Sequence, residues 1–223
     1  MNLRLATALA VCAFLAGCGR EGNPFASFDT RCAKLPAPRF DVVATPLSFD
    51  RDDTRPIAEL TVKSGSALAT HRTMGLTTAM FGQSTDIDLH VVDDRRGSRA
   101  CGTPTVRVEL SMQPMTVFIA REVAETPCQR DATLAHEMKH VEVFRQVLEE
   151  AARALEREFP DAIGAELRRA ANAAELQQRL ILGVRDYLGQ FMKDWQRTLD
   201  ARQREVDSPE EYARVAAACA VSQ

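Results

Sequence analysis

The chain has 223 residues, of which 45% are hydrophobic and 26% are charged, and its formal net charge at pH 7 is −3. This length is enough for one or two domains with a proper core, and the composition is that of an ordinary globular protein. The charge argues against a nucleic-acid-binding surface, because no excess of Lys and Arg is available to neutralise phosphates. Nothing in the charge balance suggests a polybasic patch that would bind a membrane surface.

The N-terminus has the pattern of a targeting segment. The residues MNLR supply one positive charge through Arg4, and the apolar run LATALAVCAFLA follows. A helix of that length rises about 18 Å, which is too short to cross a bilayer core of about 30 Å. Residues 1–17 are therefore predicted to be a signal peptide that is cleaved, and not a membrane span.

The apolar run ends in Leu15-Ala16-Gly17-Cys18, which resembles the lipobox of bacterial lipoproteins. The resemblance implies that Cys18 carries the lipid and becomes the first residue of the mature chain. Gly19 follows the cysteine, where Asp resembles an inner-membrane retention signal, so an anchor in the outer membrane, facing the periplasm, is favoured. The alternative is an ordinary secretory signal with an incidental cysteine.

The mature chain keeps cysteines that can form disulfides in an oxidising compartment, where an even number allows two bonds and three pairings. They are Cys32, Cys101, Cys128 and Cys219. Strands predicted over residues 106–112 and 116–121 would form a hairpin through Gln113-Pro114, which brings Cys101 nearly opposite Cys128. We therefore predict Cys101–Cys128 and Cys32–Cys219. A site with four thiolates on one metal is disfavoured, because no two of these cysteines are close in sequence.

The stretch before Arg39 and the stretch after it differ in composition. Residues 18–38 are rich in Gly, Pro and small polar residues and are predicted to be a tether from the lipid. From Arg39 to about Glu125 the chain favours short strands, such as FDVVAT, IAELTV and DIDLHVV, which are separated by Gly, Pro, Asp and Ser clusters. Residues 64–82 are ambiguous and are assigned to a loop with room for one helical turn.

The C-terminal part is predicted to be helical, because Ala, Leu, Glu and Arg dominate and the apolar period changes from two to about 3.6. Long helices are expected over residues 131–158, ending before Pro160, and over residues 174–205, with a poorer helical segment at 162–173. Ser208-Pro209-Glu210-Glu211 forms a capping box that opens a last short helix.

Strands first and helices afterwards predict an α+β fold. We expect one domain over residues 39–223. In it, a small antiparallel sheet from residues 39–127 packs against a hairpin of long helices within residues 128–223.

The stretch LAHEMKHVEVF, residues 134–144, decides the functional prediction. With 100° per residue and Leu134 at zero, the apolar side chains of this helix fall at about 280–340° and its charged ones at about 60–160°. Glu137 lies at about 300°, within the apolar stripe, and His136 and His140 lie at its edge. A carboxylate placed there is costly unless something compensates its charge. Neutral imidazoles do not compensate it, but a divalent cation does.

Histidines four apart on a helix place two nitrogens within reach of one ion, and an adjacent glutamate can take the proton of a metal-activated water. His136 to His140 matches the HExxH motif of zincin metallopeptidases, whose active-site helix packs beneath a small sheet with an edge strand lining the substrate cleft. The resemblance implies a single Zn2+ and Glu137 as general base. This chain departs from the stricter pattern, because Lys139 stands where an uncharged residue is usual.

The third ligand is expected from the second long helix, whose C-terminal end returns beside His136 if the helices are antiparallel. Glu205 is slightly favoured and Asp207 is the alternative, and both can also be surface or capping charges. The longer motif that ends in a third histidine is absent, since Val143 and Gln146 stand at its Gly and His positions.

The layout also resembles a broader group of bacterial secreted proteins described as predicted zinc-dependent proteases. Cys101-Gly102-Thr103-Pro104 and Val206-Asp207-Ser208-Pro209 are the further similarities. We therefore expect a lipid-anchored periplasmic zinc metallopeptidase that acts on a peptide or protein of the cell envelope. A non-catalytic envelope lipoprotein with a structural or vestigial metal site, and a zinc hydrolase of cell-wall amide bonds, are the alternatives.

Overall fold

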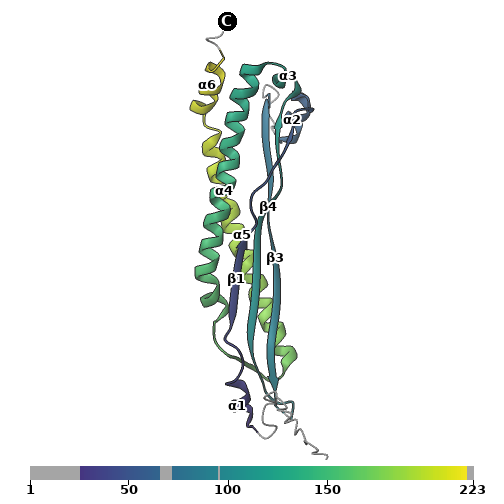
Figure 1. Ribbon diagram of the computed structural model, residues 1–223, viewed down its shortest axis with the longest axis vertical. Coiled ribbons are helices and arrows are strands. Elements are labelled where there is room, and N and C mark those ends of the chain that lie inside the picture. Colours follow the sequence, from purple (N-terminus) through teal and green to yellow (C-terminus); the bar gives the residue numbers. More distant parts are fainter. Residues whose placement is uncertain (1–25, 66–71, 95, 220–223) are drawn as a thin grey trace, which may run out of the picture.

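The computed structural model describes residues 26–65, 72–94 and 96–219. A long, narrow sheet carries two long helices on one face, which makes the molecule elongated (Figure 1). The fold is α+β, as the sequence predicts. The predicted signal peptide and Cys18 lie outside the described residues. None of the described helices is long and apolar enough to cross a membrane.

The sheet is built around one strand, β4 (Ala100–Ile119). The strand β3 (Gly75–Asp93) pairs antiparallel with β4 along nearly its whole length. Along the other edge of β4, three short strands follow one another: β5 (Arg168–Ala170), which is antiparallel, and β1 (Arg39–Ala44) and β2 (Asp50–Asp52), which are parallel. The sheet is therefore mixed, and the prediction of an antiparallel sheet is wrong for β1 and β2.

The predicted hairpin through Gln113-Pro114 is also wrong, because β4 continues through these residues. The register with β3 shifts between Ala79 and Phe81, so that Gln113 and Pro114 together face the single residue Met80 in a bulge. A proline is tolerated at such a position because it removes a hydrogen bond that the bulge does not make. The hairpin is formed by β3 and β4, and β3 includes residues 75–82, the last part of the stretch expected to be a loop.

IAELTV was expected as a strand and forms the helix α2 (Ile57–Lys63) instead. Pro56 stands at its N-cap, and its fixed φ suits a helix start. Only Leu60 is buried, whereas Val62 is 82% exposed, so the burial does not follow the period of two that a half-buried strand requires. Two further short helices are α1 (Phe28–Cys32) and α3 (Arg121–Ala124).

The predicted helix hairpin is confirmed. The helix α4 (Pro127–Ile163) begins four residues earlier than expected, with Pro127 in its first turn, and runs through Pro160. The helix α5 (Ala173–Val206) matches its prediction within one residue at each end. The capping box opens α6 (Pro209–Ala217), where Ser208 Oγ accepts a hydrogen bond from the Glu211 amide. The segment expected as a poor helix contains β5.

The core lies between the inner face of β4 and the two long helices. Alternate side chains of β4 point to this face, as expected for a sheet covered on one side only. The fully buried members of the core include Val106, Val108, Leu110, Met112, Val117, Val147, Ala151, Leu155, Phe159, Leu180, Val184 and Leu188. On the outer face Arg107 stands between Asp41 of β1 and Asp86 of β3, so that face is polar.

Two disulfides form among the four expected cysteines, but the predicted pairing is wrong. The bonds are Cys32–Cys101 and Cys128–Cys219. Because β4 does not fold back, Cys101 at its start and Cys128 beyond its end lie at opposite ends of the sheet. The Cys32–Cys101 bond also fixes α1 to the sheet, so the last part of the predicted tether 18–38 is folded.

Candidate metal centre

Four residues near the start of α4 form one buried polar stripe. Thr133, His136, Glu137 and His140 are spaced three and four apart, and each is at most 9% exposed. This confirms the expectation that Glu137 lies within the buried face. Lys139 points away from the stripe, as its position on the helix predicts, and its side chain is 46% exposed.

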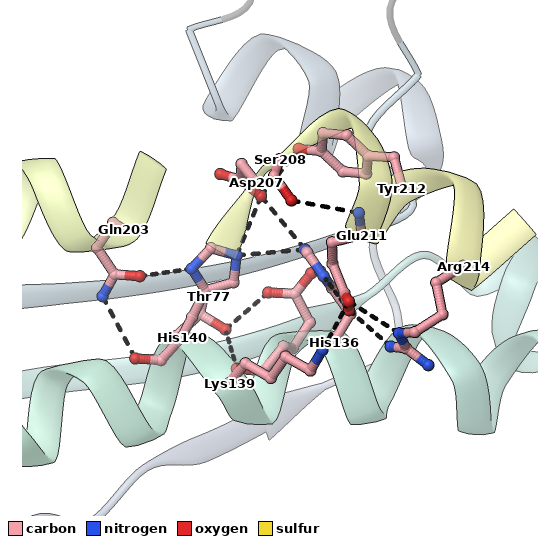
Figure 2. A network of polar contacts seen from close by, with 11 residues as sticks. Thr77, His136, Lys139, His140, Gln203, Asp207, Ser208, Glu211, Tyr212 and Arg214 are labelled. Atoms are coloured by element: carbon pink, nitrogen blue, oxygen red, sulfur yellow. Dashed lines mark hydrogen bonds and ion pairs between the residues drawn. The ribbon is translucent and has the colours of Figure 1, made fainter. Parts of the chain in front are cut away.

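The two histidines and Asp207 converge on one point (Figure 2). The Nε2 atoms of His136 and His140 are 3.3 Å apart, and the Asp207 Oδ1 atom lies 3.3 Å from the first and 3.2 Å from the second. Each of the three residues offers one ligand atom, and these atoms lie within 4.8 Å of one another. This group can hold a metal ion.

Asp207, the alternative third ligand, belongs to this group, and the favoured Glu205 does not. Successive helix positions differ by 100°, so residues two apart point to different sides. Glu205 lies within α5 and faces a surface hollow beside Lys139 and Arg202. Asp207 is the C-cap of α5, and the chain then continues as α6 alongside the start of α4. The geometry therefore favours Asp207, the alternative, over Glu205 as the third ligand.

Gln203 fixes the ring of His140. The Gln203 Nε2 group donates to the backbone carbonyl of His140 over 3.3 Å, and this assigns Gln203 Oε1 as the atom that faces the ring. The Oε1 atom lies 2.5 Å from His140 Nδ1 and accepts a hydrogen bond from its N–H group. The neutral ring then has its unprotonated nitrogen, Nε2, facing Asp207, as a metal ligand requires.

Glu211 of α6 plays the corresponding part for His136, because its Oε1 atom lies 3.3 Å from His136 Nδ1. The next residue, Tyr212, donates its hydroxyl to Asp207 Oδ1 over 2.8 Å. The sequence reasoning missed both residues, and it missed Gln203. The capping box was the available signal, because it starts α6 directly after Asp207 and so places Glu211 in the first turn of that helix. A glutamate at this position of the box, however, ordinarily bonds to the N-cap backbone.

Glu137 takes no part in the metal-binding group and is held from the sheet side. Thr77 of β3 donates its hydroxyl to Glu137 Oε2 over 2.7 Å. At Gly75, two residues earlier, an added Cβ would lie 2.4 Å from Glu137 Oε1 and 2.6 Å from the methyl carbon of Thr133. The start of β3 therefore approaches α4 closely enough that only glycine fits there.

Burial and the neighbouring charges shift the pKa values of these groups. Burial raises the pKa of the Glu137 carboxyl, and the hydrogen bond from Thr77 only partly offsets this. Burial also acts to lower the pKa of His140, but its hydrogen bonds to Asp207 and Gln203 outweigh burial and leave that pKa raised. The pKa of Asp207 lies well below its usual range, because hydrogen bonds from both histidines outweigh its burial.

The site opens into a cavity of about 590 Å3. One wall is polar and carries His136, Glu137, His140 and Asp207. The lining also includes apolar side chains from the start of β3 and the residue before it, from α4 and from α6: Met74, Leu76, Phe144 and Val215. The arrangement can therefore hold a ligand beside the metal-binding group and beside a buried carboxylate.

Comparisons of the chain with models of protein families, with curated proteins and with solved structures find no match. The functional conclusion therefore depends on the geometry of the site and on the motif.

Proposed function

We propose that this chain is a zinc-dependent metallopeptidase that hydrolyses peptide bonds in a peptide or protein of the bacterial cell envelope. The observation that carries the proposal is the position of Glu137, which lies in the same cavity as the metal-binding group without belonging to it. A structural metal site has no use for such a carboxylate, whereas hydrolysis requires a base at that place.

The size of the donor triangle supports zinc as the metal. In a tetrahedral site with bonds of about 2.0–2.1 Å, neighbouring donor atoms lie about 3.3 Å apart. The three separations here are 3.3, 3.3 and 3.2 Å. Two imidazoles and one carboxylate are also a usual set of protein ligands in catalytic zinc sites, which keep one further position open.

The residues of the chain divide the chemical work. Zinc, when bound, supplies a Lewis acid that polarises a carbonyl group and eases the loss of a proton from water. Glu137 accepts that proton, and its raised pKa suits a group that must both take a proton and return it to the leaving amine. Thr77 fixes the Glu137 carboxylate, and Gly75 leaves room for it beside β3.

The cavity favours a catalytic site over a structural one. A structural zinc site is closed by four protein ligands, whereas the part of the chain that the structure describes supplies three ligand groups beside an open space. The proposed place of action, the periplasmic face of the outer membrane, is supported by the sequence LAGC, which ends in Cys18.

The test begins with metal content. The mature chain without its lipid is purified, and zinc per chain is compared with that of the His140→Ala variant. Near-stoichiometric zinc that is lost in the variant, followed by cleavage of peptides that Glu137→Ala abolishes, would support the proposal. A protein that binds zinc and hydrolyses cell-wall amide bonds, but cleaves no peptides, would use the same mechanism on another substrate. A wild-type chain that does not retain zinc after reconstitution would refute the proposal that the protein is a zinc enzyme.

A further inference from the structure

Glu211 is held from three sides, and only one of these contacts is local to its own helix. Lys139 of α4 donates to Glu211 Oε2 over 2.6 Å. Arg214 of α6 donates to both carboxylate oxygens, over 2.8 and 2.6 Å. The side chain of Glu211 is 11% exposed, so this carboxylate is both anchored and largely removed from water.

The remaining direction of Glu211 points to the metal-binding group. Its Oε1 atom faces Nδ1 of His136, while Nε2 of the same ring faces Asp207 (Figure 2). A carboxylate that accepts a hydrogen bond from the Nδ1–H group fixes the tautomer and the orientation of a histidine ligand. It also makes the other ring nitrogen a stronger metal ligand.

Lys139 is the charged residue inside the motif, where the stricter pattern has an uncharged one. It lies three positions after His136, on a neighbouring part of the same helix surface, and reaches across to α6. The departure from the motif therefore coincides with a contact to Glu211 that, among the described hydrogen bonds and ion pairs, only His136 shares with Lys139 on α4.

We propose that Glu211, held by Lys139, is the positioning residue of His136, so that the charged motif position is a working part of the metal site. This inference rests on the proposed metal site. An ordinary surface ion pair would stabilise α6 slightly and would leave metal affinity unchanged. The two roles are therefore separated by the affinity for zinc and not by stability.

The complete lipidated chain is purified in detergent, and its zinc dissociation constant is measured by competition with a chromogenic chelator. We expect Glu211→Ala to weaken zinc binding about 10- to 100-fold. Glu211→Gln should weaken zinc binding less, because the amide oxygen can still accept a hydrogen bond from the Nδ1–H group. Lys139→Met should weaken it in the wild-type background but add little to Glu211→Ala, because the two residues act as one unit.

Arg145→Met is the matched control. Arg145 lies on the same helix and bonds to Glu142 and Glu149, but it does not contact the site, and its loss should leave zinc affinity unchanged. The 15N signals of the His136 ring in metal-free protein give a second measurement: the proton should leave Nδ1 in Glu211→Ala and stay there in Glu211→Gln. This reading keeps the test valid if α6 loosens in one variant.

The inference is overturned if Glu211→Ala and Lys139→Met bind zinc as tightly as wild type while His136→Ala loses it, or if their effects simply add. In that case the proposed enzyme stands and only the positioning role fails. A wild-type chain with no affinity for zinc would overturn both.

Discussion

The two ends of this elongated molecule differ in the polar side chains that they bury. At one end the Cys32–Cys101 disulfide packs with Phe28 in an apolar cluster, and both cysteines are almost inaccessible. At the other end a second apolar cluster, which includes Leu60 and Ile119, is accompanied by a group of buried polar side chains. The described residues contain few buried polar side chains, and all of them except Thr103 line the cavity: Thr73, Thr133, His136, Glu137 and His140. Buried polar groups cost stability, so their concentration at one end is the pattern expected of a functional site.

The two disulfides also differ in the part of the molecule that each one holds in place. Their loops span 69 and 91 residues, so the loss of entropy in the unfolded chain, about 4–5 kcal/mol for each, hardly distinguishes them. The Cys128–Cys219 bond, however, ties the start of α4 to the end of α6, a helix with no buried residue. One bond secures a core, and the other holds the helix that brings Glu211 and Tyr212 to the site.

The largest effect is expected at the centre of the polar end. Under the proposed function, Glu137→Gln should lower peptide hydrolysis by about 10²- to 10⁴-fold, because the proposed base is lost, while zinc binding persists. The metal-free protein should unfold at the same temperature or a higher one, because the amide avoids burying a charge. Steady-state kinetics and calorimetry measure the two quantities, and Glu142→Gln on the exposed face is the control. An active Glu137→Gln enzyme would assign the base to another group.

Removal of each disulfide tests the difference between the ends directly. Replacing Cys32 and Cys101 by Ser should reduce the free energy of unfolding by about 2–5 kcal/mol and leave the zinc affinity of the folded protein unchanged. Replacing Cys128 and Cys219 by Ser should release α6 by local unfolding and weaken zinc binding. Urea unfolding and chelator competition separate the two outcomes. Equal effects of both pairs on zinc affinity would contradict the division into a structural and a functional end.

The polar end was also the part that the sequence predicted least completely. The helix hairpin and the burial of Glu137 follow from the period of 3.6, and α6 follows from its capping box, because these signals are local. Asp207 was second to Glu205, and Gln203 and Glu211 were missed, because their roles arise only where the end of α5 meets the start of α4. The disulfide pairing failed for the same reason: it depended on a hairpin at Pro114, and a bulge accommodates that proline within one strand.

A smaller effect is expected where β3 meets α4. Gly75→Ala places a Cβ against Glu137 Oε1 and Thr133, and we expect a loss of about 1–3 kcal/mol in stability together with reduced activity, since Glu137 must move. Gly82→Ala on the same strand is the matched control, because its Cβ would meet only Ser111 Oγ at an ordinary 3.5 Å. Chemical denaturation and hydrolysis assays compare them. If Gly75→Ala behaved like Gly82→Ala, the close approach of β3 would be unimportant for the base.

The smallest effect concerns the pH dependence of stability and of zinc binding. In the folded protein, the pKa values of Glu137 and His140 are raised above their unfolded values of 4.5 and 6.5. The stability that comes from binding these protons is therefore fully present below the unfolded values, and it is lost as the pH rises through the folded values. Asp207, whose pKa is lowered, stays ionised over this range and adds no change. Zinc requires neutral imidazoles, so its affinity should rise with pH, by about tenfold per unit for each proton displaced.

The increase in unfolding temperature that zinc produces should therefore grow between pH 6 and pH 8, because the metal-free site weakens while zinc binding strengthens. Calorimetry at several pH values, with and without zinc, measures this increment. In His136→Ala the increment should vanish at every pH, whereas in the variant lacking Cys32 and Cys101 it should keep its pH dependence, since that end holds none of the titrating groups. An increment that shrinks as the pH rises would show that the stabilising ion is not bound by these histidines.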